Sequence, residues 1–156
     1  MGNDLHMRYL EDFTPGETET IDGYLLTEEE IISFAQKWDP QPMHIDPEAA
    51  KTSHFGGLIA AGAHLMAIGV HQLYARPTRP AVIGVMGLDH VRFLEPARPG
   101  DLIALLRECI EVRPSRSKPD RGVVRNRVTL INQHGKPLLR YEDTILVIRR
   151  PIQGTP

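Results

Sequence analysis

Residues 58–75 read LIAAGAHLMAIGVHQLYA, and apolar or small side chains occupy almost every position of this stretch. A surface helix would carry one polar face, so this composition predicts a helix that is buried on most of its sides. The stretch is nearly as long as a membrane span, but His64, His71 and Gln72 interrupt it and no anchoring residues flank it. We therefore expect the central helix of a soluble protein that has no membrane partner.

The spacing of apolar residues changes to alternation after this helix. Four stretches rich in Val, Ile, Leu and Arg follow at hairpin spacing, at residues 81–94, 101–113, 122–133 and 138–149. Turn-forming residues separate them, and no crossover helix is expected between them. The order therefore predicts an α+β domain in which an antiparallel sheet wraps the long helix.

Shorter elements are expected ahead of the long helix, beginning with one or two strands before Thr27. A helix follows Thr27, because Thr27 and Glu30 have the spacing of a capping box, and Asp39-Pro40 ends it. Three prolines within residues 39–47 predict a loop. Asp46-Pro47 then begins a short helix, with Asp46 as its cap.

The composition is that of an ordinary globular protein, and the length of 156 residues corresponds to one domain over residues 1–156. Hydrophobic residues make up 41% and charged residues 24% of the chain, which argues against disorder. The single cysteine, Cys109, excludes a scaffold of intrachain disulfides. Residues 1–6 lack the basic-then-apolar order of a secretory signal, so we expect a cytoplasmic protein.

Charge is distributed unevenly along the chain. Residues 1–50 hold 12 acidic and 2 basic side chains, whereas residues 51–156 hold 8 acidic and 16 basic ones. The densest basic stretch lies within residues 113–127. It is either a solvated hairpin that balances the acidic first third, or a site for the phosphates of a small ligand. A nucleic-acid partner is not expected, because the basic residues lack interleaved aromatics and the pI is about 6.4.

Asp39 and His44 are the first candidates for chemistry. A carboxylate and an imidazole suit acid–base catalysis, because histidine titrates near neutral pH and aspartate is ionised there. In an extended chain the two would lie roughly 16 Å apart on opposite sides, so the prolines must turn the loop to bring them together. The residues also suit a helix-ending Asp39 and a packed or surface His44, and on spacing alone this structural interpretation is the stronger.

The stretch from Asp39 to Gly62, DPQPMHIDPEAAKTSHFGGLIAAG, resembles the signature of the MaoC-like dehydratases, which include the (R)-specific enoyl-CoA hydratases (hydratase 2). The matching pattern is Asp, four residues, His, an Asp-Pro with two alanines, then Phe, an apolar triplet and Gly. The sequence PARPGD at residues 96–101 resembles a turn of the same family, and the resemblance covers roughly residues 8–150. It implies the hot-dog fold, and a homodimer or a pair of dimers with active sites near the subunit interface.

For this chain the resemblance implies a lyase that adds water reversibly to a trans-2-enoyl thioester of CoA or of an acyl carrier protein. Asp39 and His44 would activate the water, and the backbone N–H of Gly62 would bind the thioester oxygen. No cofactor is implied. Contacts with the substrate would come from Phe55, Ala61 and, for the phosphates of CoA, Arg121.

His64 and His71 lie seven positions apart on one face of the predicted helix, a spacing that could bring two metal ligands together. No further carboxylate or cysteine stands at ligand spacing from them. We therefore expect no metal site.

Three positions depart from the hydratase 2 pattern. Ala61 stands where that group usually has His, Val70 where it often has Ser, and Gln41 where it has Asn. These differences remove side chains that would support Asp39, and they leave the substrate class open. A non-catalytic acyl-thioester binding protein and an acyl-CoA thioesterase are therefore alternatives. Residues 58–75 lack the Asp or Glu that hot-dog thioesterases commonly place on or near the central helix, which counts against the second.

Overall fold

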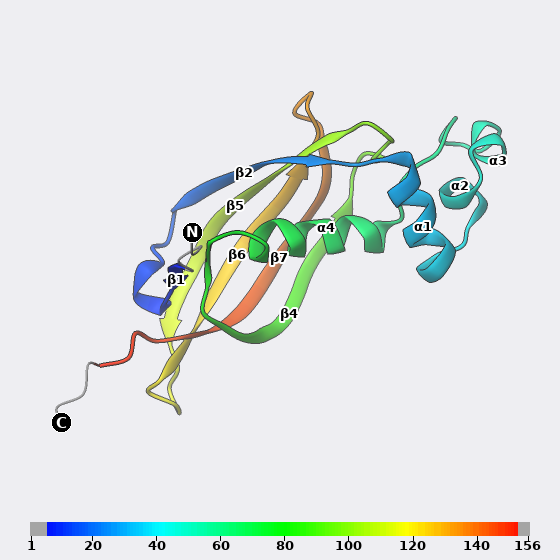
Figure 1. Cartoon of the computed structure of the whole chain (residues 1–156). Helices are drawn as coiled ribbons and strands as arrows, with labels where there is room; N and C mark the ends of the chain where they lie inside the picture. Colours follow the sequence, from blue (N-terminus) through cyan, green and yellow to red (C-terminus); the bar gives the residue numbers. More distant parts are fainter. Residues whose placement is uncertain (1–5, 153–156) are drawn as a thin grey trace, which may run out of the picture.

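One helix lies across the inner face of a curved antiparallel sheet in the computed structural model, which describes residues 6–152 (Figure 1). This helix, α4, spans Gly62–Tyr74 and confirms the predicted central helix, although it begins later than residue 58. Residues 58–61 lie outside the helix, because the N–H groups of Ile59 and Ala60 donate to carbonyls of neighbouring segments instead of a helical turn. These hydrogen bonds set where the helix can begin.

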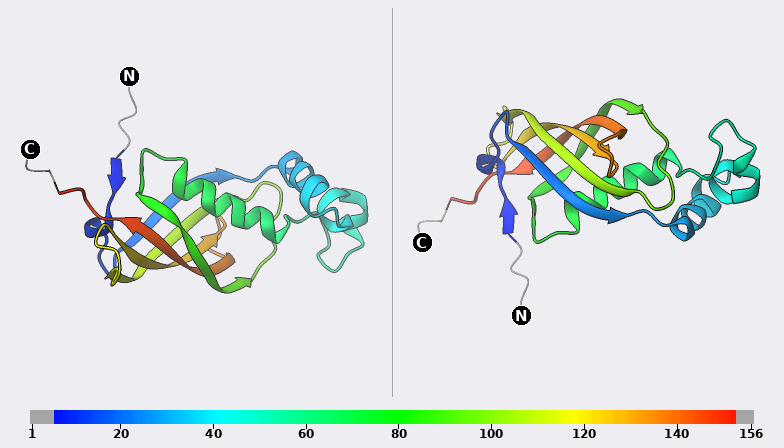
Figure 2. Two further views of the ribbon diagram at one scale, coloured as in Figure 1. Left: turned by 90° about the horizontal axis from the view of Figure 1, so that it is seen from below. Right: turned by 90° about the horizontal axis from the view of Figure 1, so that it is seen from above.

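Five strands form the main sheet in the order β2-β5-β6-β7-β4, and all neighbours in it are antiparallel. Their bounds are Thr18–Leu25 for β2, Val82–Phe93 for β4, Leu102–Pro114 for β5, Arg121–Ile131 for β6 and Pro137–Ile148 for β7. The four strands expected after the central helix are confirmed. Figure 2 shows the sheet curling around α4 from two further sides, which is the hot-dog architecture of an α+β protein.

The inner face of the sheet and one side of α4 form the main hydrophobic core. Alternate residues of β5, β6 and β7 are buried, as the two-residue period of a strand requires. On the helix, Leu65, Ile68 and Leu73 pack into this core. The sheet covers one side of α4, so the helix is less enclosed than expected. Its exposed stripe consists of Ala63, Ala67, Val70 and His71.

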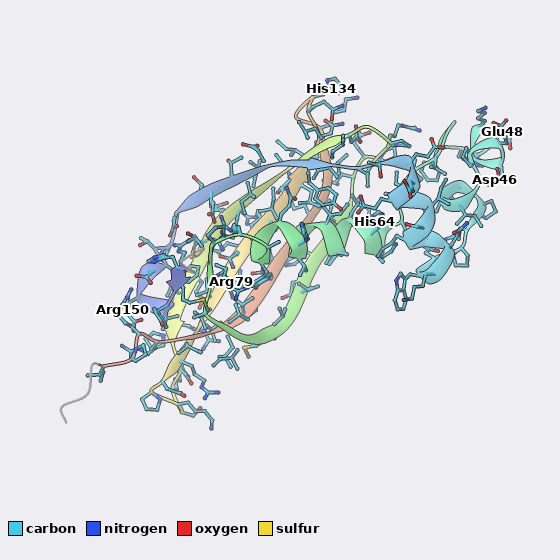
Figure 3. The ribbon with its side chains drawn as sticks, in the orientation of Figure 1. Asp46, Glu48, His64, Arg79, His134 and Arg150 are labelled. Atoms are coloured by element: carbon cyan, nitrogen blue, oxygen red, sulfur yellow. The ribbon has the colours of Figure 1, made fainter. Side chains whose placement is uncertain are left out.

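Three short helices connect β2 to α4. They are α1 at Glu28–Trp38, α2 at Pro42–Ile45 and α3 at Pro47–Lys51. Thr27 caps α1 by accepting the Glu30 N–H at 3.2 Å, and Asp46 caps α3, so both predicted helix starts are confirmed (Figure 3 labels Asp46). The prediction of a loop throughout residues 39–47 was wrong, because Pro42 takes the first position of a helical turn, where proline fits.

Two features near the chain ends were not predicted. One is the parallel pairing of His6–Arg8 (β1) with Thr78–Pro80 (β3), and the other is the 3-10 helix at Leu10–Asp12. The strands themselves agree with the one or two expected before Thr27, since both β1 and β2 precede it. Residues 1–5 and 153–156 lie outside the described residues. The prediction that residues 1–6 form no secretory signal therefore falls almost entirely outside them. Within the described part of the chain, none of the helices has the length and apolar character needed to cross a membrane.

Two arginines of β6, Arg125 and Arg127, form a ladder of ion pairs with neighbouring strands. Each spans to glutamates of β5 and β7 at 3.0–3.6 Å, and the pairs are Arg125 with Glu111 and Glu142, and Arg127 with Glu108 and Glu142. The charges of these two arginines are therefore balanced by glutamates across the sheet. The interpretation that it balances the acidic first third of the chain was wrong for these two arginines.

A buried carboxyl group on the inner face of the sheet makes stability depend on pH. Asp143 on β7 is 6% exposed and accepts a hydrogen bond of 2.8 Å from the Asn126 side chain. Burial raises the pKa of Asp143 above its ordinary value, and the hydrogen bond from Asn126 opposes that rise in part. The contribution of Asp143 to stability is therefore fully present below its unfolded pKa of about 3.9 and is lost as pH rises through its folded pKa.

We expect Asp143→Asn to gain stability relative to the wild type as the pH rises from about 4 to about 8. Asparagine does not ionise, and its carbonyl oxygen can still accept the hydrogen bond from Asn126. Urea denaturation across this range measures the free energy of unfolding of both proteins. Glu142→Gln is the matched control on the outer face of the same strand, and it should show no such gain. A difference between Asp143→Asn and wild type that is constant or shrinks with pH would contradict this expectation.

Candidate functional site

A pocket of about 540 Å³ opens beside the first turn of α4. Figure 2 shows that this turn lies at the end of the sheet opposite β1. Its walls come from the end of α1, from α2, from the extended residues before α4, and from the end of β4 with the loop that follows. Most of the lining side chains are apolar. The polar ones are Asp39, Gln41, His44 and Glu95.

Asp39 stands at the end of α1 as its C-terminal cap. Its backbone N–H donates to the carbonyl of Ala35 at 2.9 Å, which completes the last turn of the helix. Its side chain is 30% exposed, so one part faces the pocket while another is held by protein. The Gln41 side-chain amide donates to Asp39 Oδ1 at 2.7 Å, which leaves Oδ2 for other contacts.

His44 is buried, and the short helix α2 turns it back toward Asp39. Its Nδ1 lies 2.8 Å from the carbonyl oxygen of Ile59. A carbonyl accepts hydrogen bonds, so Nδ1 carries a proton and Nε2 is the nitrogen left for chemistry. That Nε2 lies 3.6 Å from Asp39 Oδ2. The fold therefore brings together the two residues that an extended chain would hold far apart.

Gly62 is the first residue of α4 and lines the same pocket. Among the described residues, no acceptor takes its backbone N–H, as is usual for the first turn of a helix. A Cβ at this position would lie 2.7 Å from the ring of Phe93 on β4. A larger residue would push this ring aside, and the absence of a side chain leaves the N–H of Gly62 open toward the pocket.

Phe55 and Ala61 take different places. Phe55 is 40% exposed and lines the pocket, and its carbonyl accepts a hydrogen bond of 2.6 Å from the Arg98 guanidinium. Ala61 is fully buried at the N-terminal cap of α4 and does not line the pocket. The fold thus places Asp39, His44, Phe55 and Gly62 around one pocket, whereas Ala61 is buried outside its lining.

Arg121 is not brought to this pocket by the fold of one chain. It is the first residue of β6, and its guanidinium pairs with Asp120 at 2.8 Å. Phe93 lines the pocket and pairs with Leu139 of β7, which pairs on its other side with Leu130 of β6. Leu130 therefore marks the position on β6 that is level with Phe93. Nine positions separate Leu130 from Arg121, which is about 30 Å along a strand.

Phe93 and the loop after it were missed by the sequence analysis. They lie 54 or more positions after Asp39, so no local spacing links them to it. The sheet register carries the end of β4 to the start of α4, and the loop residues 94–97 complete the pocket wall. The one signal in the sequence was the PARPGD turn, which resembles a turn of the same family, because residues 93–97 lie directly before it or at its start.

The two histidines of α4 have separate neighbours. His64 Nε2 lies 3.0 Å from the carboxylate of Glu30, and His71 packs edge-on against Tyr24. Glu30 is 34 positions away from His64, so sequence spacing could not reveal this contact. Within residues 6–152, no three side chains of His, Cys, Asp or Glu are grouped closely enough to hold a metal ion.

Comparisons with known proteins point to one family. The sequence profile of the MaoC like domain matches residues 12–132 of this chain. YdeM of Bacillus subtilis (strain 168), an uncharacterized protein, is 27% identical over 142 residues, which cover 90% of this chain and 99% of YdeM.

Solved structures share the fold over nearly the whole chain. The MaoC-like dehydratase of Rhodospirillum rubrum is 34% identical with a TM-score of 0.85, and the match covers 93% of this chain and 99% of that one. The R-hydratase PhaJ1 of Pseudomonas aeruginosa is 24% identical with a TM-score of 0.69, covering 95% and 93% of the two chains. The second likeness shows a common fold.

Proposed function

The chain belongs to the MaoC-like dehydratase family, and from that premise we propose that it adds water reversibly to a trans-2-enoyl thioester. In this proposal the protein is an enoyl-CoA hydratase, or 3-hydroxyacyl-CoA dehydratase, that acts on a thioester of CoA or of an acyl carrier protein. The observation that carries it is the placement of Asp39, His44 and the free N–H of Gly62 around one largely apolar pocket. The name of the structurally similar R-hydratase agrees with this chemistry.

Asp39 and His44 supply the acid–base pair. Their facing atoms are 3.6 Å apart, which is too far for a direct hydrogen bond and close enough for one water to contact both. As the water oxygen bonds to the β-carbon of the enoyl group, Asp39 takes a proton from it. The proton taken by Asp39 passes to His44 Nε2, which carries none at the start, and from there to the α-carbon, so that one water molecule is added in total and both side chains return to their initial state.

Gly62 supplies the donor for the thioester oxygen. Negative charge develops on that oxygen as the β-carbon is attacked, and a backbone N–H at a helix N-terminus stabilises it. The acyl chain would lie among the apolar lining of the pocket, with Met43, Leu65 and Phe93 as neighbours. No step of this mechanism requires a cofactor.

A second copy of the chain covers the free edge of β4 in this proposal. In the five-stranded sheet β4 pairs with β7 alone, so its other edge has unpaired backbone groups. Exposed apolar side chains lie along β4 and directly after it, at Ile83, Val85, Met86, Leu88, Phe93 and Leu94. An exposed apolar edge strand promotes association, and Phe93 belongs to both this edge and the pocket. A homodimer, or a pair of dimers, would bury it.

We expect Asp39→Asn and His44→Asn each to lower turnover of enoyl-CoA by about 10²- to 10⁴-fold, the usual contribution of a positioned acid or base. The asparagine at position 44 keeps a donor for Ile59 and removes the group that faces Asp39. Loss of the ultraviolet absorbance of the conjugated thioester, over straight and branched acyl chains, measures the reaction.

Wild-type rates in both variants would contradict the assignment of this pair. Release of free thiol would identify a thioesterase instead. Binding of the thioester in calorimetry without turnover would identify a non-catalytic binding protein.

A second prediction isolates the N–H of Gly62. Gly62→Pro removes this N–H at the first helical position, where proline fits and where Ala61 is already extended. Gly62→Ala adds the same Cβ beside Phe93 and keeps the N–H. We expect the proline variant to have a kcat about 10²- to 10³-fold below that of the alanine variant. Equal kcat values in two folded variants would exclude this donor.

The third prediction concerns the assembly. Val85→Lys on β4 should convert a dimer into monomers of 17.5 kDa, because it places a charge on the apolar edge. Leu25→Lys on the other edge strand is the control, since Leu25 and Val85 are both 56% exposed. Light scattering after gel filtration measures the mass. An assembly that survives Val85→Lys but not Leu25→Lys would place the interface on β2.

A further inference from the structure

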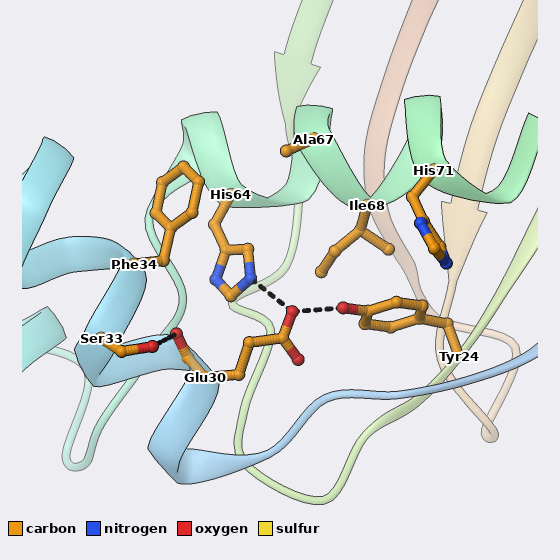
Figure 4. A pocket seen from close by; sticks show the side chains of 8 residues that line it. All are labelled: Tyr24, Glu30, Ser33, Phe34, His64, Ala67, Ile68 and His71. Atoms are coloured by element: carbon orange, nitrogen blue, oxygen red, sulfur yellow. Dashed lines mark hydrogen bonds and ion pairs between the residues drawn. The ribbon is translucent and has the colours of Figure 1, made fainter. Parts of the chain in front are cut away.

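A second pocket, of about 330 Å³, lies between β2, α1 and α4 and contains a hydrogen-bonded cluster (Figure 4). One oxygen of the Glu30 carboxylate accepts two hydrogen bonds, from the Tyr24 hydroxyl and from His64 Nε2, the latter at 3.0 Å. Tyr24 belongs to β2, Glu30 to α1 and His64 to α4. Three elements that are separate in the sequence are thus joined at a single carboxylate.

His64 is held on two sides by α1. Besides its bond to Glu30, its ring stacks on the ring of Phe34 with centroids 4.4 Å apart and planes 5° from parallel. Glu30 and Phe34 are four residues apart, so they lie on the same face of α1. His64 itself is 2% exposed. His64 is therefore the polar contact by which α1 docks on α4, beside the apolar contact of Ile31 with the core.

The cluster is built to hold elements together rather than to transform a ligand. His64 Nδ1 is buried and has no hydrogen-bond partner among the described residues, so an incoming substrate cannot reach it. His64 Nε2 is occupied by Glu30. Burial and the hydrogen bond to Glu30 raise the pKa of Tyr24, so that its hydroxyl stays a donor at all ordinary pH values.

We propose that His64, held by Glu30 and Phe34, fixes the angle of α1 on α4. It acts as a positioning residue, because α1 ends at Asp39 and α4 begins at Gly62, two residues before His64. This inference rests on the proposed hydration reaction, in which both ends must face one substrate.

The geometry makes the catalytic pair sensitive to this contact. Glu30 lies nine positions before Asp39, or about 13 Å along the helix axis, so a tilt of about 5° at Glu30 moves Asp39 by about 1 Å. A displacement of about 1 Å can lower an enzymatic rate by about 100-fold. Because Asp39 lies at the opposite end of α1 from Glu30, a change at Glu30 removes no group from the reaction itself.

The test compares Glu30→Ala with Glu30→Gln. The glutamine side-chain oxygen still accepts from Tyr24 and His64, whereas alanine removes the acceptor. We expect Glu30→Ala to lower kcat about 10- to 100-fold with KM changed less than about threefold, and Glu30→Gln to stay within about threefold of wild type. His71→Ala is the matched control, because His71 lines the same pocket and touches Tyr24 rather than α1. It should leave kcat unchanged.

Amide hydrogen exchange gives a readout that does not depend on activity. In Glu30→Ala, exchange should become faster over α1 and over residues 39–45, and in His71→Ala it should not. Unchanged kcat and unchanged exchange in a folded Glu30→Ala variant would overturn the inference. An equal loss of kcat in Glu30→Gln and Glu30→Ala would also overturn it, since the charge rather than the contact would then matter. If wild type hydrates no enoyl thioester, the proposed function fails, and exchange over residues 39–45 alone decides whether this contact positions Asp39.

Discussion

The hydrogen bond between His44 Nδ1 and the carbonyl of Ile59 joins the two segments on which the site depends. Residues 58–61 are extended, so their backbone groups need partners outside a helix, and buried groups without partners are costly. Met43 O accepts the Ile59 N–H and the His44 ring donates to the Ile59 carbonyl, so α2 satisfies both. This arrangement sets where α4 begins, which nitrogen of His44 is free, and where the pocket opens.

The segment from α1 to α3 projects beyond the end of the sheet and depends on a few contacts with α4 and the extended residues before it (Figures 1 and 2). One anchor is the His44 contact with Ile59, and the other is the contact of His64 with Glu30. Glu30 precedes Asp39 and Ile59 follows His44 in the chain, so these two contacts hold the segment that carries Asp39 and His44 from both sides. In the positioning role proposed for His64, its contact near the first turn of α1 controls the position of Asp39 at the other end of that helix. The docking of α1 on α4 and the position of the proposed site thus depend on the same segment of the chain.

Much of the fold could be predicted because it depends on neighbours in the sequence. Alternating apolar residues predicted four strands, and the caps at Thr27 and Asp46 predicted two helix starts. The helical turn at Pro42–Ile45 was missed, since three prolines close together also suit a loop. The resemblance to a known family contributed the hot-dog fold and the roles proposed for Asp39, His44 and Gly62, which spacing alone did not favour.

The sequence by itself determined the α+β class and the central helix, because those depend on periodicity and local motifs. Tertiary structure decided the 3.6 Å approach of Asp39 and His44, the place of Phe93 in the pocket and the distance of Arg121 from it. It also decided the pairing of Glu30 with His64 across 34 positions. Each of these contacts joins segments whose separation is set by packing and sheet register, and no local pattern of residues encodes such a distance.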